Sequence, residues 1–139
     1  MKALTVCQPY AHLIALGIKR VENRTWATNF RGRLAIHAGK SRAWLLHGDQ
    51  DRWPDMAFGA VIATADLTNC VSIDRVRRLD PAYSWVAAHE HTEGPFCWVL
   101  ENVTPLSAVV PCRGQPGLFD LPDDVLRLVN KYDIENALL

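Results

Sequence analysis

The chain of 139 residues is 49% hydrophobic and 22% charged, which is typical of a compact globular domain and excludes a disordered or collagen-like chain. Its formal net charge at pH 7 is zero, so the molecule as a whole has no net charge that would attract a polyanion. The distribution is uneven, because residues 1–42 hold eight Lys and Arg and the single acid Glu22, a net charge of +7, which leaves −7 for the remainder. We therefore predict one domain over residues 1–139, with any anion-binding surface in its N-terminal third.

The cysteines and the apolar segments indicate whether the chain binds a metal ion and where in the cell we expect it. Cys7, Cys70, Cys97 and Cys112 lie far apart, with no CxxC pair and no close His to complete a zinc site. We therefore expect neither a metal nor a cofactor. The sequence has no charged-then-apolar leader and no run of about 18 apolar residues, so we expect a soluble, cytoplasmic protein with reduced thiols and no membrane partner.

The first predicted elements are a strand at 4–6 and a helix over 9–17. Pro9 suits the first turn of that helix, and Gly17 suits the left-handed conformation that commonly ends one. Residues 19–26 alternate in polarity and predict an extended segment. The chain then turns at Arg31-Gly32 into a further strand over 33–38.

The middle of the chain predicts longer elements. Between residues 40 and 54 we expect a short helix around Trp44 followed by a mobile loop. Small and β-branched residues over 59–68 predict the clearest strand, and 74–88 is expected to be helical with an interruption at Pro81.

The C-terminal part predicts a strand over 96–103, another at 109–110, a turn at 114–117 and a helix over 122–132. Short strands with helices in the connections argue for an α+β fold and against a parallel doubly wound sheet. We expect a mixed, mainly antiparallel barrel of about five to seven strands.

The densest group of chemically distinctive residues follows the first helix. If 19–26 is a strand, Glu22, Arg24 and Trp26 share one face, because side chains two apart point the same way. A carboxylate, a guanidinium and an indole together offer a base-pairing edge, a phosphate clamp and a stacking plane, which are the requirements of a nucleobase pocket. We predict a polar cleft formed by Lys19, Glu22 and Arg24, with Gln8, Tyr10, Trp26, Arg31 and His37 around it.

Structural readings of the same residues stay open. Glu22 and Arg24 also fit an exposed ion pair, worth on the order of 0–1 kcal/mol. Trp26, at the end of a strand, is more often a core residue than a stacking platform, and Gln8 also fits a helix cap. His89 and His91 have the spacing of a metal pair on a strand, but without a third ligand nearby a solvated loop is the better interpretation.

Two strings in this region point to a family. Q-P-Y-A-x-L-I-x-x-G-I-K-x-x-E-x-R-x-W starts at Gln8, and R-G-x-L-x-I-H-A starts at Arg31. They closely resemble the ASCH domain of the PUA-like superfamily, which is named for homology to a transcriptional coactivator. The resemblance continues through 59–70, 94–100 and 110–114. It implies a PUA-like β-barrel with short helices in the connections and a cleft lined by the Gly17-to-Arg24 element.

The resemblance also implies RNA-related roles. Some bacterial relatives are amidohydrolases that remove acyl groups from the exocyclic N4 nitrogen of cytidine, and others are ribonucleases. In the amidohydrolases a Lys and a Thr three residues later are functional; Lys19 matches the first, whereas Glu22 replaces the second and cannot act as a hydroxyl nucleophile. Tyr10 is a second departure, since many members have Trp there.

The leading hypothesis is a binding module for RNA, another single-stranded nucleic acid or a modified nucleoside. Lys19, Arg24 and Arg31 would hold phosphate, and Glu22 would accept hydrogen bonds from a base edge. An aromatic ring, Tyr10 or Trp26, would stack on the base, worth roughly 1–3 kcal/mol.

Two alternatives belong to other classes. As a hydrolase, the chain would use Glu22 or a Lys19 of lowered pKa to activate water, with Lys19 or Arg24 stabilising the oxyanion. As a coactivator-like module, it would bind a protein partner.

Overall fold

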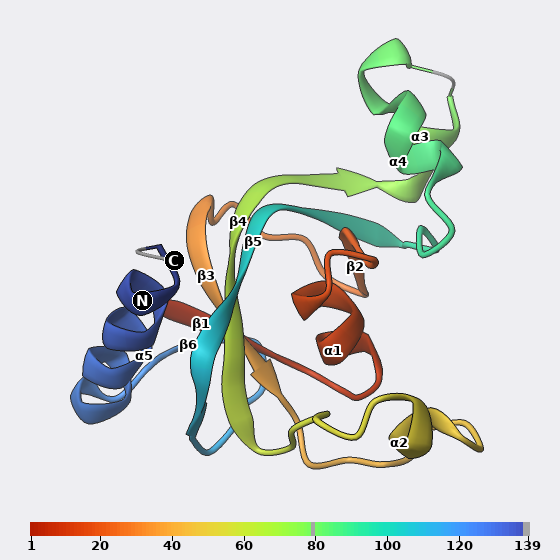
Figure 1. Cartoon of the computed structure of the whole chain (residues 1–139). Coiled ribbons are helices and arrows are strands. Elements are labelled where there is room, and N and C mark those ends of the chain that lie inside the picture. The colour runs from red at the N-terminus through yellow and green to blue at the C-terminus, as the bar shows by residue number, and fades with distance from the viewer. Residues whose placement is uncertain (79, 138–139) are drawn as a thin grey trace.

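The computed structural model describes residues 1–78 and 80–137, and its main feature is a six-stranded sheet curled into a half-barrel (Figure 1). The strand order is β2-β5-β4-β3-β1-β6. Neighbouring strands are antiparallel except β1 and β3, which run parallel. The predicted α+β fold with a mixed, mainly antiparallel sheet is therefore confirmed, and the curled sheet keeps two edges, β2 and β6, instead of closing on itself.

Most of the predicted elements are found close to their expected bounds. The elements are β1 (Lys2–Val6), α1 (Tyr10–Ala15), β2 (Val21–Arg24), β3 (Gly32–Ala38), α2 (Asp49–Arg52), β4 (Ala60–Ser72), α3 (Ile73–Arg77), the 3-10 helix η1 (Pro81–Tyr83), α4 (Ser84–Ala88), β5 (Phe96–Pro111), β6 (Leu118–Asp120) and α5 (Asp123–Ala137). The helical region around Pro81 is confirmed as three short pieces, while Leu79 lies outside the described residues.

Two predictions about local structure are wrong. The short helix expected around Trp44 is instead α2, which begins at Asp49 after Gly48 takes the left-handed φ of 89°. The two strands predicted at 96–103 and 109–110 form one strand, β5. Its pairing with β4 shifts register three times, so the long hairpin bends through bulges where the sequence suggested a break. The short edge strand β6 was not predicted.

Both faces of the sheet are buried, and strand alternation explains how. Leu34 and Ile36 of β3 pack with Ile14 of α1, whereas Ala35, between them, packs on the opposite face with Val125 and its neighbours from α5. Figure 1 shows α1 on one side of the curled sheet and α5 on the other. The helix α1 therefore occupies the inside of the half-barrel, and the segments that flank it reach the mouth of that interior.

The connection between β4 and β5 forms an arm that projects beyond the sheet and carries α3, η1 and α4 (Figure 1). It has its own small core, in which Val76 and Val86 pack with Val21 of β2 and Cys97 of β5. The arm is thus attached to the edge strand β2. Among residues 1–78 and 80–137, no helix combines the length and apolar character that crossing a membrane requires.

Candidate ligand-binding site

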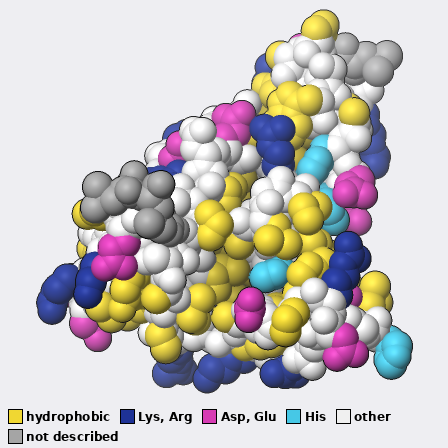
Figure 2. Space-filling view, in the orientation of Figure 1, with side chains coloured by type: hydrophobic (Ala, Val, Ile, Leu, Met, Phe, Trp, Pro, Cys, Tyr) yellow, Lys and Arg dark blue, Asp and Glu magenta, His cyan; other side chains and the backbone are white. Residues whose placement is uncertain are grey.

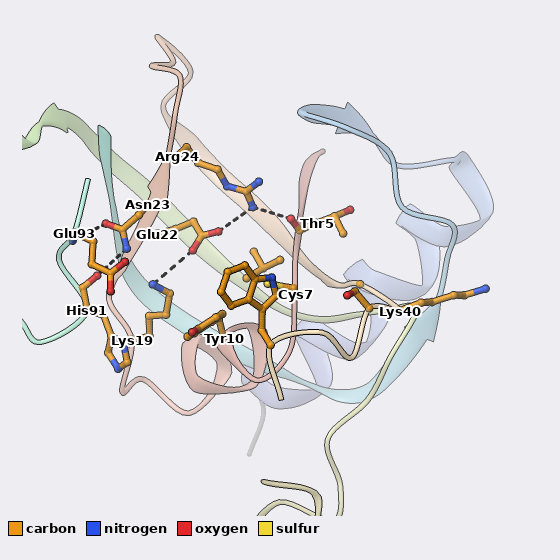
Figure 3. A pocket seen from close by; sticks show the side chains of 14 residues that line it. Thr5, Cys7, Tyr10, Lys19, Glu22, Asn23, Arg24, Lys40, His91 and Glu93 are labelled. Atoms are coloured by element: carbon orange, nitrogen blue, oxygen red, sulfur yellow. Dashed lines mark hydrogen bonds and ion pairs between the residues drawn. The ribbon is translucent and has the colours of Figure 1, made fainter. Parts of the chain in front are cut away.

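A cavity of about 540 Å³, called here the first cavity, opens where α1, β2 and the loop after β3 meet (Figure 3). Its lining residues are Thr5, Val6, Cys7, Tyr10, Lys19, Glu22, Asn23, Arg24, Gly39, Lys40, Ser41, Trp44, His91 and Glu93. This volume lies within the range of roughly 300–1,000 Å³ that is usual for small-ligand pockets. Its lining combines three cations, two carboxylates and two aromatic rings, so it suits a ligand that is both planar and polar.

Three charged side chains form a line across this cavity. Glu22 Oε2 lies 2.8 Å from Arg24 Nη2, and Glu22 Oε1 lies 3.6 Å from Lys19 Nζ. The Lys19 and Glu22 side chains are only 4% and 10% exposed, so these ion pairs are largely desolvated. A carboxylate has about four lone-pair sites. Glu22 therefore keeps acceptor capacity for a ligand although both of its oxygens are engaged.

The turn after α1 delivers Lys19 to the cavity. Gly17 takes φ +77°, and the amides of Ile18 and Lys19 both donate to the Leu13 carbonyl, at 3.0 and 3.1 Å. This left-handed closure ends the helix as the sequence predicted. It turns the Lys19 side chain inward, where Nζ donates to the Val21 carbonyl at 2.6 Å and lies 5.5 Å from the centre of the Tyr10 ring.

Strand β2 positions the other two charges by its pairing with β5. Glu22 and Arg24 lie opposite Trp98 and Phe96, and as next-but-one neighbours they share a face, as predicted. Arg24 Nη2 also donates to the Thr5 carbonyl at 2.7 Å (Figure 3). Because β2 and β1 are not neighbours in the sheet, this bond spans the opening of the half-barrel and holds the guanidinium in place.

Asn23, on the same strand, fixes the far wall of the cavity. Its side-chain Nδ2 donates to the His91 carbonyl, and its Oδ1 accepts from the amides of Glu93 and Gly94, at 2.8 to 2.9 Å. The base of the arm is thereby tied to β2. This leaves the Glu93 side chain at the cavity wall, beside the line of charges (Figure 3).

Burial changes the acid–base properties of two groups here. Burial lowers the pKa of the Lys19 ammonium, and the nearby Glu22 carboxylate only partly opposes that effect. Burial, together with the same carboxylate, raises the pKa of the Cys7 thiol. Cys7 is therefore held as a thiol, whereas Lys19 is closer than an ordinary lysine to giving up its proton.

The structure brings together four of the eight predicted site residues, Tyr10, Lys19, Glu22 and Arg24, as lining of the first cavity. Gln8 lies beneath it, completely buried, where its side chain accepts from the His12 amide and donates to the Ala57 carbonyl. The helix-cap reading of Gln8 is thus the one that the structure supports.

The other three lie elsewhere. Trp26 packs edge-on against Trp98, with ring centres 4.7 Å apart, so its placement in the cleft was wrong. The guanidinium of Arg31 bends back to the carbonyls of Thr28 and Phe30 and does not reach the cavity, which corrects its predicted role as a phosphate clamp. His37 is buried next to a second, adjoining cavity.

Several lining residues were missed. Trp44, whose side chain is 61% exposed, supplies the aromatic surface that had been assigned to Trp26. Lys40 supplies a cation from the loop after β3. No sequence signal marked Trp44, which stands next to Ala43 and Leu45 as a core residue would. Lys40, His91 and Glu93 reach the cavity only through the folding of distant loops.

The two histidines of the arm lie in a turn, not in a strand. Their rings are 5.6 Å apart, and His89 Nε2 accepts a hydrogen bond from the Arg20 amide. Burial lowers the pKa of His89. Within the described part of the chain, no group of three or more His, Cys, Asp or Glu side chains is arranged to hold a metal ion.

Comparison with known proteins shows the family. The profile of the family described as "ASCH domain" matches residues 4–109. The chain belongs to the ASCH domain family. Activating signal cointegrator 1 from Homo sapiens is 30% identical to this ASCH chain over 135 residues, and the Mus musculus protein of that name is 29% identical. Each match covers 88% of the chain but only 22% of the relative, so the chain spans about a fifth of the length of these proteins.

Solved structures support the fold of this ASCH domain. The crystal structure of ASCH from Zymomonas mobilis superposes with a TM-score of 0.58 at 13% identity, covering 94% of this chain and 93% of that one. A mutant of the same protein gives 0.57 at 17% identity, covering 94% and 96%. At such identities the likeness establishes the shared fold.

Proposed function

We propose that this ASCH domain binds a nucleoside, or an unstacked base of a single-stranded nucleic acid such as RNA, in the first cavity. The observation that carries the proposal is the Glu22 carboxylate, held between Lys19 and Arg24 in a cavity walled by the Tyr10 and Trp44 rings. These are the three elements of base recognition: a hydrogen-bonding edge, cations and a stacking surface.

Each group has a distinct task in this proposal. Glu22 accepts hydrogen bonds from an amino or imino group, because its ion pairs with the two cations fix its orientation. The exposed ring of Trp44 stacks on the base. A base within a duplex has its edge already paired, so the proposal favours a single strand or a free nucleoside.

The relatives and the free thiols support two further parts of the proposal, the kind of partner and the cellular location. The relatives' name, Activating signal cointegrator 1, supports a protein partner as the alternative to nucleic acid. We keep a cytoplasmic location within the proposal, supported by the free thiols of Cys7, Cys70, Cys97 and Cys112.

The test uses two exposed residues of one loop. Trp44→Ala removes the proposed stacking ring, and Leu46→Ala, at a side chain 75% exposed, is the matched control. Fluorescence anisotropy with short single-stranded RNA and DNA, and calorimetry with nucleosides, measure the affinity. We expect Trp44→Ala to weaken binding by roughly 5- to 150-fold, the range that 1–3 kcal/mol of stacking implies, and Leu46→Ala to leave it unchanged. Equal effects of the two variants, or no binding by the wild type, would overturn the proposal in favour of a protein-binding module.

A second function is favoured by one observation: burial lowers the pKa of Lys19, which lies 3.6 Å from the Glu22 carboxylate beside the same cavity. In a hydrolase, one of these groups takes a proton from a water molecule that attacks the acyl carbon, and the amide C–N bond breaks to release the amine and the carboxylic acid. Such a base contributes roughly 10²- to 10⁴-fold to rate.

N4-acylated cytidine and short RNAs, followed by mass spectrometry, test this second function. Glu22→Gln should abolish turnover and keep substrate binding if the domain is an enzyme. In a pure binding module it should change base preference instead, and the wild type should release no product.

A further inference from the structure

A second cavity, of about 530 Å³, adjoins the first and shares four lining residues with it: Thr5, Arg24, Gly39 and Lys40. Its remaining lining comes from the loop after β5 and from His37. Arg24 therefore stands between the two spaces, with Nη2 engaged by Glu22 and by the Thr5 carbonyl. The shared lining places the two cavities side by side, so one ligand can contact both.

The two cavities differ in charge. The first has two acids, Glu22 and Glu93, in its lining, and Glu22 pairs with both Lys19 and Arg24. Among the described residues that line the second, none is Asp or Glu, and Arg24, Lys40 and Arg113 are basic. Figure 2 shows Lys and Arg side chains along the lower edge of the molecule, where Figure 1 places the loops that follow β3 and β5.

His37 is neutral, so the charge of the second cavity comes from the three basic side chains. Burial lowers the pKa of His37, so its ring is uncharged at pH 7. Its Nε2 donates to the Cys112 carbonyl at 2.7 Å, and in the neutral ring Nδ1, 3.1 Å from the Thr5 hydroxyl, is then the acceptor.

The loop after β5, which lines the second cavity, lies close to Thr5 and His37. A Cβ atom on Gly114 would lie 2.8 Å from Thr5 Oγ1 and 2.9 Å from His37 Cε1, so only glycine allows the backbone to approach this far. The side chain of Lys40 packs over Gly59, where a Cβ atom would lie 2.9 Å from Lys40 Cε and 3.2 Å from its Cγ. Figure 3 shows the Lys40 side chain directed away from Glu22.

We infer that the second cavity binds a phosphate group, the one attached to the nucleoside whose base occupies the first cavity. A compact dianion or phosphodiester is the ligand that arginine and lysine side chains recognise best. Among the described residues, Lys40 and Arg113 line the cavity without a neighbouring acid, while Arg24 also pairs with Glu22. The identity of the attached nucleoside rests on the proposed function; the phosphate site stands on its own lining. The preferred ligand of the domain is therefore a nucleotide or an oligonucleotide and not a free nucleoside.

Two measurements test this inference, with Arg113→Gln as the variant and Arg127→Gln, an exposed charge on α5, as the matched control. Nuclear magnetic resonance titration with inorganic phosphate should shift the amides of Gly114 and Gly117 in the wild type and in the control. The shifts should disappear in Arg113→Gln. Unchanged shifts in Arg113→Gln, or no shifts in the wild type, would overturn the phosphate site.

The second measurement compares a nucleoside, its monophosphate and a dinucleotide. We expect the phosphorylated ligands to bind on the order of tenfold tighter or more, with that advantage lost in Arg113→Gln. For a single strand, the variant should also reduce the slope of log affinity against log salt by about 0.7. Nucleoside binding with no gain from phosphate would overturn this inference and leave the proposed function intact. Phosphate binding without any base-dependent binding would overturn the proposed function and leave the phosphate site intact.

Discussion

Lys19, Glu22 and Arg24 form two ion pairs that share Glu22. The loss of protein stability on mutation should depend on which of these residues is replaced. Glu22 is the shared anion of two cations, so Lys19→Met leaves it paired with Arg24 at 2.8 Å. Glu22→Gln instead leaves the Lys19 ammonium buried with the Val21 carbonyl as its hydrogen-bond acceptor. We therefore expect Glu22→Gln to be much the more destabilising change.

The burial of the Glu22 and Lys19 side chains sets the size of the expected loss in the free energy of unfolding. Breaking a buried ion pair by removing one partner costs about 3–5 kcal/mol, and at 10% exposure Glu22 is little screened by solvent. Lys19 can lose its proton, which limits the cost, so we expect about 3 kcal/mol for Glu22→Gln. Lys19→Met removes a charge that burial already disfavours and should cost on the order of 0–1 kcal/mol. In melting temperature these are shifts of roughly 12 °C and at most about 4 °C.

Urea denaturation at pH 7, followed by circular dichroism, measures both variants and the double variant. Adding Lys19→Met to Glu22→Gln should restore part of the lost stability, because it removes the stranded charge. The loss in Glu22→Gln should also shrink as pH rises from 7 to 9, since the lowered pKa of Lys19 lets the folded state release that proton before the unfolded state does. Equal destabilisation by the two single variants, or additive losses in the double variant, would refute this reasoning.

Three further changes should have distinct effects. Because burial lowers the pKa of His37, the unfolded chain takes up a proton at this residue first as pH falls through about 6.5. The free energy of unfolding should therefore decrease from pH 7 to pH 5, and it should decrease less in His37→Gln. Urea denaturation midpoints measure both. In Gly94→Ala, the new Cβ would lie 2.5 Å from Ile73 Cβ at a φ of +80°, so limited proteolysis should cut the arm faster than in wild type. Thr64→Val removes the hydroxyl that donates to Asp133, at a cost of about 1–3 kcal/mol in thermal unfolding.

The charged part of the site could be predicted because it depends on local geometry. Two-residue alternation places Glu22 and Arg24 on one face of any strand, and Gly17 marks where the preceding helix must end. The same rule failed for Trp26 because β2 ends at Arg24. Beyond that residue the chain leaves the strand, and the half-buried Trp26 ring packs against the core at Trp98.

The rest of the site depends on contacts that no local pattern contains. Trp44 and Lys40 come from an irregular loop, and Arg113 lies 89 positions after Arg24 in the sequence. Their proximity follows from the curl of the sheet and from the close approach of Gly114 to His37. Arg31 was predicted to belong to the site because of its charge. Its guanidinium instead donates to two carbonyls of its own loop.

The cost of burying charge explains why the two cavities differ. An isolated charge is expensive to desolvate, so the buried cations of the first cavity must be paired, and Lys19 and Arg24 share Glu22 for this reason. Cations without a neighbouring acid are tolerated where solvent reaches them, and Lys40 and Arg113 are both exposed. A ligand with an uncharged polar base and a charged phosphate matches this division. The paired charges of the first cavity can discriminate between bases, whereas the exposed charges beside it can attract any phosphate.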